Sequence, residues 1–322
     1  MELKEGVCVD LPVDSSGFKQ LHVGKVRPAI SVMMVCYNSA HTLPWAFGSL
    51  LAQGFVNWEC IFVDDGSSDG SYDVAVGLGD PRIRAFRFNT NRGRGTVRQF
   101  ALEQAKGDYL CILDADDWMF PWRLQAEMDF LEVESETAVV SAGMAILDRA
   151  GELAGSRGCA DGDRPRVFPS MTRLRMPPFS FPASMIRMSV ARLYKFDPEI
   201  LAEDTDYLMQ IVVNHRYGVL DRNVYVYTEH YTLALGKYLE VYNSLSLMFH
   251  KFRTMFPLQS RINGLTVLLK SLVYRSAFVL KRSEWLIDRR RLVSPTPRDV
   301  EEFELARTTV ALMVQNVFGV PL

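Results

Sequence analysis

The sequence predicts an α/β fold in which helices cover both faces of a mixed, mostly parallel sheet, followed by a helical C-terminal extension. Short apolar runs alternate with segments of helical periodicity, which is typical of parallel strands joined by crossover helices. Beyond residue 230 only helical patterns remain. The 322 residues suffice for one large domain with an extension. We expect an N-terminal lead over residues 1–27, an α/β domain over 28–230 and the extension over 231–322.

Apolar runs of strand length end at turn-forming residues, and this pattern sets the expected order of elements. The run over residues 30–36 ends at Tyr37-Asn38-Ser39, as expected of a buried strand that enters a turn. The expected strands are residues 30–36, 60–63, 83–88, 109–113, 138–147 and 219–227. The expected helices of this domain are residues 43–52, 95–106, 122–132 and 204–215.

Two segments depart from this alternation. Residues 151–182 are rich in Gly, Pro, Arg and Asp with little periodicity, which indicates either a mobile loop or an irregular segment that covers the substrate. The C-terminal part predicts three helices, over residues 238–256, over residues 262–281, and one that begins at Thr296 as N-cap with Pro297 in its first turn.

Composition and charge exclude several classes of protein. Hydrophobic residues make up 48% of the chain and charged residues 23%, the balance of a globular protein. A formal charge of −2 provides no global basic field for a polyanion, so nucleic acid is not an expected partner. The five cysteines form no C-x-x-C pair, and we expect reduced thiols.

Hydropathy predicts neither a secretory signal nor a membrane span. The first thirty residues contain no continuous apolar stretch. The longest apolar candidate, residues 265–280, is interrupted by Lys270 and Arg275. The expected location is therefore the cytoplasm.

Three carboxylates follow the strand expected at residues 109–113, within four positions: Asp114, Asp116 and Asp117. These charges repel one another unless a cation lies among them. Hard carboxylate oxygens suit Mn²⁺ or Mg²⁺, which take one or two protein carboxylates and complete their shell with phosphate oxygens and water. The cluster indicates a site for a metal and a diphosphate. The alternative is an acidic turn in which one aspartate caps the helix near Trp122.

A second acidic loop, Asp64-Asp65-Gly66-Ser67-Ser68-Asp69-Gly70, follows an earlier strand. The carboxyl ends of parallel strands meet at one edge of a sheet, where ligands of such sheets bind. We therefore expect both acidic sites to face one crevice. Taken alone, the second loop is also good turn chemistry.

The motifs, taken in order, resemble those of glycosyltransferase family 2 proteins with the A-type glycosyltransferase fold. The resemblance covers roughly residues 30–227 and implies a Rossmann-like nucleotide-sugar-binding domain. The matching motifs lie at residues 31–38, 63–70, 80–83, 91–93, 105–109 and 113–117.

The resemblance assigns roles on the donor side of the site. It implies that Asp65 recognises the nucleobase and that the backbone from Val35 to Tyr37 lines the base pocket. It also implies that Asp114 and Asp116, with Ala115 between them in the donor site, address the ribose and the metal, and that Asp117 shares the ligand role.

Arg98 is a candidate donor contact. Similar proteins carry an arginine there in an Ala-Arg-Asn triplet, whereas this chain has Val97-Arg98-Gln99. The arginine is kept while both neighbours differ.

Glu203 and Asp204 begin a predicted helix about ninety residues beyond the metal cluster. Acidic residues at a helix N-terminus complement the macrodipole, so capping is one interpretation. The resemblance implies that Asp204 is the general base that takes the proton of the acceptor hydroxyl, with Glu203 as a supporting residue. In-line attack of this kind inverts the anomeric centre, and we find no separate nucleophile for a retaining mechanism.

The resemblance also bears on one histidine and on processivity. His230 follows the last expected strand and is a candidate third metal ligand, the alternative being a hydrogen-bonded structural histidine. Processive synthases of this broad group carry a Gln-x-x-Arg-Trp signature, but here Gln210 is followed by Ile-Val-Val-Asn. The sequence therefore favours transfer of a single sugar.

The C-terminal helices have two alternative roles. Their basic and aromatic residues suit a peripheral contact at the inner face of a membrane, which would serve a lipid-linked acceptor. Alternatively, they pack on the domain or on another subunit, as in a homodimer. The basic residues are Lys251, Arg253, Arg261, Lys270, Arg275, Lys281 and Arg282.

The expected activity is that of an inverting glycosyltransferase of the hexosyltransferase type with Mn²⁺ or Mg²⁺. The expected donor is a nucleotide sugar, with a UDP-sugar as the leading candidate. The expected acceptor is a hydroxyl of a glycan, lipid or small-molecule natural product. Two alternatives stay open: a nucleotidylyltransferase and a catalytically inactive nucleotide-sugar-binding protein.

Overall fold

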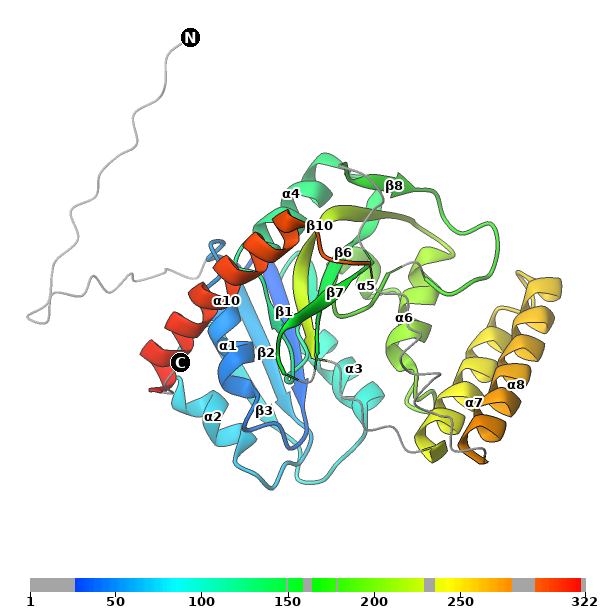
Figure 1. Ribbon diagram of the computed structural model, residues 1–322, viewed down its shortest axis with the longest axis horizontal. Helices are drawn as coiled ribbons and strands as arrows, with labels where there is room; N and C mark the ends of the chain where they lie inside the picture. Colours follow the sequence, from blue (N-terminus) through cyan, green and yellow to red (C-terminus); the bar gives the residue numbers. More distant parts are fainter. Residues whose placement is uncertain are drawn as a thin grey trace, which may run out of the picture.

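The computed structural model describes residues 27–148, 150–158, 164–177, 179–228, 235–279 and 293–319. Its centre is a mixed sheet with the strand order β3-β2-β1-β4-β9-β6-β10-β5, in which β7 pairs with β6 and β8 with β10. Helices lie on both faces of the sheet (Figure 1). The predicted α/β class with a mixed sheet is confirmed.

The N-terminal half alternates strand and helix, as predicted. Its elements are β1 (Ile30–Cys36), α1 (Leu43–Leu51), β2 (Trp58–Asp64), α2 (Ser71–Gly77), β3 (Ile83–Arg87), α3 (Arg94–Gln104) and β4 (Tyr109–Ile112). All pairings among these four strands are parallel. Every residue of β2 is buried, because helices cover the sheet on both sides, and this explains its continuous apolar run.

The second half mixes parallel and antiparallel pairs. Its elements are β5 (Trp118–Met119), α4 (Arg123–Val133), β6 (Thr137–Leu147), β7 (Leu153–Arg157), β8 (Arg166–Phe168), β9 (Ser184–Arg187), α5 (Met188–Ala191), α6 (Glu203–Val212) and β10 (Arg216–Thr228). Strand β9 lies antiparallel between β4 and β6. The long parallel register joins β6 to β10.

The expectation of no regular structure over residues 151–182 is wrong in part. Strand β7 pairs with β6, and strand β8 pairs with β10. These strands have five and three residues, which is too short for a period of two to be visible in the sequence. Residues 159–163 and 178 lie outside the described residues.

Alternate residues of the central strand β1 belong to two separate cores. Ile30, Val32 and Met34 pack with α1 and α4, whereas Met33 packs with α3 and α6. Because successive side chains of a strand point to opposite faces, one apolar strand stabilises both layers. Free, buried Cys36, Cys60 and Cys111 agree with the prediction of reduced thiols.

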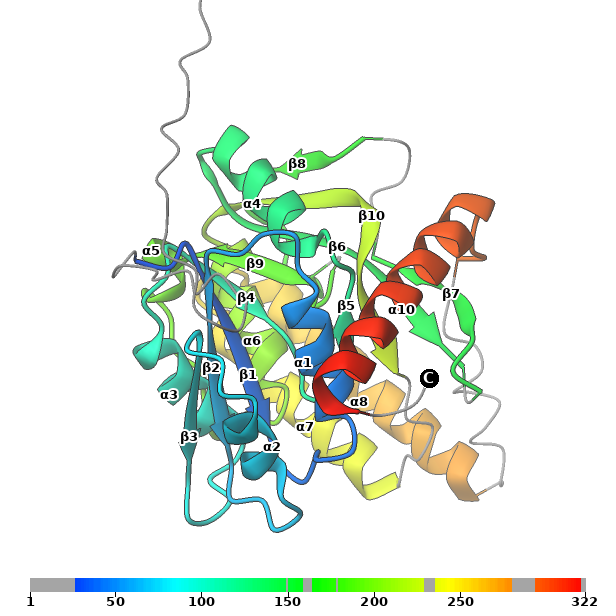
Figure 2. The same ribbon diagram turned by 90° about the vertical axis from the view of Figure 1, so that its left-hand side faces the viewer.

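Three helices are described after β10: α7 (Leu235–Lys251), α8 (Pro257–Val279) and α10 (Pro297–Phe318). Helix α10 lies across α1, and its Phe303 and Val310 pack with Trp118 of β5 (Figures 1 and 2). The predicted N-cap at Thr296 is confirmed, since Thr296 and Asp299 form a capping box. The boundary between residues 230 and 231 stays a prediction.

The antiparallel hairpin of α7 and α8 lies at the other side of the molecule from α10 (Figure 1). Its Met248, Phe249 and Phe252 join the core cluster that contains Tyr207 of α6. Among the described residues, none of the helices combines the length and the apolar composition that a membrane span requires.

Gly107, part of one of the matching motifs, is required by close backbone approach. A Cβ at this position would lie 2.5 Å from the backbone nitrogen of Ser31. We expect Gly107→Ala to lower the free energy of unfolding by about 1–3 kcal/mol, because the backbone of β1 has to shift. Urea denaturation monitored by circular dichroism measures the change.

A second glycine substitution is the matched control. A Cβ at helical Gly77 would meet no atom within 4 Å. Gly77→Ala should leave the stability unchanged or raise it by up to about 1 kcal/mol. Equal losses in the two variants would contradict the steric explanation.

Candidate active site

The two acidic loops lie at one edge of the sheet, as the sequence predicts. Parallel pairing sets Cys36 of β1 beside Asp64 of β2, and Met33 beside Ile112 of β4. The loops that follow β1, β2 and β4 therefore open together at the carboxyl ends of the strands. These three loops form the frame of the candidate site.

The loop after β2 is fastened to the loop after β1 by its polar side chains. The Ser67 hydroxyl accepts from the backbone N–H of Asn38 at 2.8 Å, and Asp69 accepts from Ala40 N–H at 3.0 Å. Asn38 has a left-handed φ of 52°, and its side-chain oxygen accepts from Ser68 N–H. The candidate base-binding backbone at Val35 and Tyr37 thus leads directly into a braced turn.

Asp65 is buried and holds a third loop. Its two carboxylate oxygens accept from the backbone N–H groups of Arg92 at 2.6 Å and Gly93 at 3.0 Å. Burial raises the pKa of Asp65, although these two hydrogen bonds oppose the shift. Tyr37, by contrast, directly follows β1 and is 51% exposed.

The Asp117 side chain is buried and hydrogen-bonded within the protein. Its oxygens accept from the Tyr225 hydroxyl at 2.9 Å and from Thr228 N–H at 3.0 Å, and the residue is 2% exposed. Burial, followed by the charges of Asp116 and Asp114, raises its pKa well above the usual value. Both oxygens of Asp117 therefore already accept hydrogen bonds from the protein, and its share in binding a metal stays a prediction.

Asp114 and Asp116 are left facing the site. The Asp114 carboxylate forms an ion pair with Arg98 at 3.0 Å, and Asp116 lines a cavity of about 240 Å³ with Trp45 and Phe303. Ala115 is buried between them, and its carbonyl accepts from the Thr42 hydroxyl at 2.7 Å.

The predicted cluster of three metal-binding carboxylates is not assembled. Among the residues that the structure describes, no three His, Cys, Asp or Glu side chains converge as a metal site. His230, the candidate third ligand, lies outside the described residues. A metal here would depend on Asp114 and Asp116 together with ligands from its substrate.

Arg98 connects the end of β4 to the start of α6. It is 3% exposed, and it binds Glu203 at 2.7 Å and Asp114 at 3.0 Å. Burial acts to lower its pKa, but Asp114, Glu203 and Asp204 together raise the pKa above its usual value. Arg94 adds a second, more exposed contact to Glu203 at 3.3 Å. Glu203 therefore positions Arg98, and both are fixed before any ligand binds.

Asp204 lies in the first turn of α6 and faces a cavity of about 330 Å³. The cavity is also lined by Arg157, Phe179 and Tyr227. Asp204 accepts from the backbone N–H of Thr205 at 2.5 Å and from its hydroxyl. The N-cap position belongs to Ala202, which makes no side-chain capping bond, but Asp204 lies among the acidic residues of the first turn, so the helix-terminus interpretation stays open beside that of a base.

Two residues behind the site escaped sequence reasoning. Fully buried Arg123 pairs with Glu127 and donates to the carbonyls of Ile112, Pro182 and Ser184. Tyr225 receives a hydrogen bond from the backbone N–H of Asp114 and donates to Asp117. The only sequence signal was the i, i+4 spacing of Arg123 and Glu127, which is common on exposed helices.

The model of the family described as glycosyl transferase family 2 matches residues 31–198. This match covers more than half of the chain and every motif of the acidic frame. The chain belongs to glycosyl transferase family 2.

Curated relatives carry similar names. The putative glycosyltransferase EpsE of Bacillus subtilis is 33% identical over 171 residues, which are 52% of this chain and 59% of EpsE. A second relative is WfaP of Escherichia coli, named as a UDP-Glc:alpha-D-GlcNAc-diphosphoundecaprenol beta-1,3-glucosyltransferase. It is 32% identical over 105 residues, which are 33% of this chain and 42% of WfaP. The chain spans about half the length of these curated relatives.

Solved structures share the fold. S. aureus TarS 1-349 in complex with UDP-GlcNAc has a TM-score of 0.59 at 19% identity, over 91% of this chain and 83% of TarS. The mannosyltransferase PcManGT from Pyrobaculum calidifontis, in complex with GDP-Man and Mn²⁺, has a TM-score of 0.53 at 15% identity, over 92% and 88%. The A-type glycosyltransferase fold expected of a family 2 protein is thereby confirmed.

Removal of the Arg98 guanidinium should destabilise the fold. Arg98→Met would leave partly buried Asp114 without this partner and buried Glu203 with only the exposed Arg94, and we expect a loss of about 3–5 kcal/mol in the free energy of unfolding. Urea denaturation at neutral pH measures it.

The control is an exposed ion pair. Arg216 and Glu136 lie 2.8 Å apart with side chains 46% and 77% exposed. Arg216→Met should change the stability by less than about 1 kcal/mol. A similar, small effect of both substitutions would contradict the central role of Arg98.

Proposed function

We propose that this chain is an inverting, metal-dependent glycosyltransferase that moves one sugar from a nucleotide diphosphate donor to a hydroxyl acceptor. The observation that carries the proposal is the Arg98 bridge, which joins Asp114 on the acidic loop to Glu203, the neighbour of Asp204. The bridge thereby fixes the position of Asp114, on the side of the proposed leaving group, relative to that of Asp204, the proposed base. Such fixed geometry is what an in-line displacement requires.

The donor side of the proposal rests on the loops after β1 and β2. Half-buried Val35 and exposed Tyr37 lie at the carboxyl end of β1, and Asp65 accepts hydrogen bonds from the backbone N–H groups of Arg92 and Gly93. A UDP-sugar is the leading donor, because WfaP is named for UDP-Glc and TarS was solved with UDP-GlcNAc. The complex of PcManGT with GDP-Man keeps a GDP-sugar as the second candidate.

The residues present fit a divalent metal. Asp116 and the second oxygen of Asp114 supply hard ligands, and Mn²⁺ or Mg²⁺ takes its remaining ligands from phosphate and water. Burial raises the pKa of Asp114, and the negative charges of Asp116 and Asp204 raise it further, although Arg98 acts in the opposite direction. A bound cation would relieve the repulsion among these carboxylates. A bound metal would neutralise charge on the departing diphosphate. Arg98 adds a fixed positive charge on the same side.

Asp204 is the proposed general base. Its carboxylate takes the proton of the acceptor hydroxyl while the hydroxyl oxygen bonds to the anomeric carbon and the bond from that carbon to the diphosphate oxygen breaks. Attack opposite the leaving group inverts the anomeric centre. No covalent sugar-enzyme intermediate is needed, and the absence of the processive signature after Gln210 agrees with single transfer.

The acceptor is proposed to be a hydroxyl of a glycan, a lipid or a small natural product. The cavity beside Asp204 is lined by Phe179, Phe181 and Tyr227, whose rings suit the apolar face of a sugar. Among the residues that the structure describes, one buried nitrogen of the Arg157 guanidinium has no hydrogen-bond partner, which favours an acceptor with a negative charge. WfaP, a relative, is named for a diphosphate-linked acceptor.

The two rival functions make different demands. A nucleotidylyltransferase would usually carry a basic, Gly-rich loop after its first strand, whereas Tyr37-Asn38-Ser39-Ala40-His41 follows β1 here. An inactive binding protein would bind donor without turning it over. Thermal stabilisation by a panel of nucleotide sugars, followed by hydrolysis of the best one, separates the binder from the enzyme.

The metal assignment predicts the behaviour of Asp116→Asn. This change keeps the size of an outward-facing side chain but removes a charged ligand, so the fold should stay intact while the Mn²⁺-dependent part of UDP binding is lost. Isothermal titration of UDP with and without Mn²⁺ measures it. Asp129→Asn, on the exposed face of α4, is the charge-matched control. Unchanged UDP affinity of Asp116→Asn in the presence of Mn²⁺ would contradict the assignment of Asp116 as a metal ligand.

The base assignment predicts that Asp204→Asn separates chemistry from binding. Asparagine cannot accept a proton at neutral pH, so turnover of the donor should fall by about 10²–10⁴-fold. UDP affinity and stability should stay near those of the wild type, because the printed ion pairs of Arg98 are with Asp114 and Glu203, and asparagine can still accept the hydrogen bond from Thr205 N–H. Wild-type turnover, or a joint loss of binding and stability, would mean that the base lies elsewhere.

A further inference from the structure

Helix α8 carries an apolar stripe that no part of the described chain covers. Six large side chains recur at spacings of three, four or seven residues and are each more than half exposed. They are Leu258, Ile262, Leu265, Leu269, Leu272 and Val279. A contiguous exposed stripe of this kind marks a contact with another surface.

The opposite side of the hairpin is firmly anchored. Lys251 of α7 pairs with Asp197 at 2.7 Å and with Asp206 of α6 at 2.8 Å. The Ser244 hydroxyl of α7 accepts from the backbone N–H of Ala202 at 3.1 Å. Since Ala202 directly precedes Glu203 and Asp204, the stripe is held in a fixed orientation relative to the candidate site.

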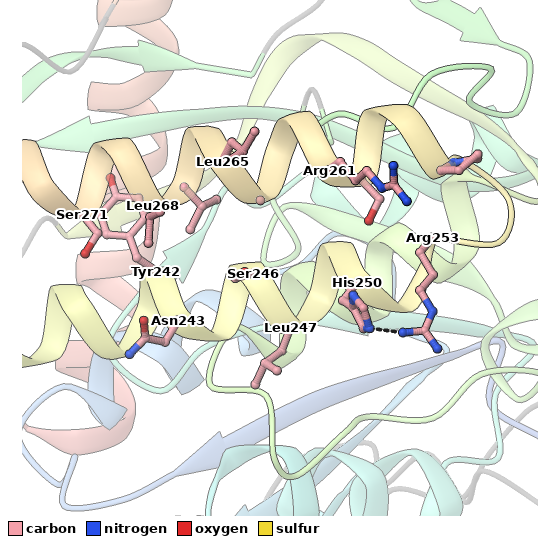
Figure 3. Close-up of a pocket in the computed structure, with 14 residues that line it drawn as sticks. Tyr242, Asn243, Ser246, Leu247, His250, Arg253, Arg261, Leu265, Leu268 and Ser271 are labelled. Carbon is pink, nitrogen blue, oxygen red and sulfur yellow. Dashed lines mark hydrogen bonds between the residues drawn. The ribbon is translucent and has the colours of Figure 1, made fainter.

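A groove of about 1050 Å³ runs between the two helices. Figure 3 shows Leu247 of α7 and Leu265 and Leu268 of α8 along its length, with Arg253 and Arg261 near the end where the helices are joined. The hairpin therefore offers apolar side chains along its length and cationic groups at one end.

The charge of the hairpin differs from that of the whole chain. Residues 235–279 contain six Lys or Arg and one acidic residue, Glu240, a formal charge of +5 in a chain of −2. Apolar side chains combined with a local positive charge are typical of helices that lie in the interface of an anionic membrane. A second copy of the same face would bring two cationic hairpins together, which Coulomb repulsion disfavours.

We propose that the α7–α8 hairpin binds the surface of an anionic lipid bilayer through the α8 stripe. The leucines enter the headgroup region, and the basic residues other than Lys251, which is bound to Asp197 and Asp206, contact lipid phosphates. This surface goes beyond the proposed sugar transfer, because it needs neither donor nor metal. Its consequence is that the cavity beside Asp204 is held at a fixed orientation relative to the membrane.

The test is co-sedimentation of the full chain with vesicles. Vesicles of equal parts phosphatidylcholine and phosphatidylglycerol should bind the protein, and vesicles of phosphatidylcholine alone should bind it at least tenfold more weakly. The triple variant Leu265→Ser, Leu269→Ser, Leu272→Ser should lower partitioning on the order of a hundredfold, because three exposed leucines no longer enter the interface.

A matched variant controls for hydrophobicity in general. Val56, Val133 and Leu193 are each more than 60% exposed and lie outside the hairpin. Changing all three to serine should leave vesicle binding unchanged. Equal losses in the two triple variants would overturn the assignment to α8, as would equal binding to both kinds of vesicle.

Light scattering after gel filtration separates the membrane from a second copy. We expect the wild type and the α8 triple variant to have the same oligomeric state. A wild-type dimer that the α8 variant dissociates, with no vesicle binding, would overturn it. UDP binding in the presence of Mn²⁺ should be equal in both proteins, so this test succeeds or fails independently of the proposed activity.

Discussion

The architecture of the site depends on one buried guanidinium. Arg98 joins two carboxylates that are far apart in sequence, Asp114 at the end of β4 and Glu203 at the start of α6. A buried charge is costly unless it is paired, so buried Arg98 requires both carboxylates. The distance between the acidic loop and the first turn of α6 is therefore fixed by electrostatics rather than by loop length. Asp204 takes its position from this arrangement.

Much of the frame was predictable because its signals are local. Apolar runs ending at Asp64 and Asp114, together with helical segments between them, sufficed to set both acidic loops at one edge of the sheet. The Thr296 cap was predictable for the same reason, since its partner Asp299 lies three residues away. The motifs that matched family 2 added the identity of the donor-side residues.

The rest depends on contacts that a sequence pattern does not reveal. Asp117 looks like a metal ligand, but its partners Tyr225 and Thr228 lie more than a hundred residues away. Strand β9 has four residues and inserts antiparallel between β4 and β6, so neither its length nor its direction followed from the alternation of strands and helices. Arg123, buried beneath the same loop, resembled an ordinary surface residue in sequence.

The packing of α10 has a consequence for biogenesis. This helix lies so close to α1 that a Cβ on Gly48 would be 2.5 Å from Val314, and it supplies Phe303 to the cavity that Asp116 lines. The first helix of the domain thus completes its packing only against the last described one. Contacts between segments as far apart in sequence as α1 and α10 form slowly. During translation the sheet and α1 therefore exist for a time without α10 packed on them. A nascent chain would therefore complete the wall of the cavity beside Asp116 only after α10 has left the ribosome.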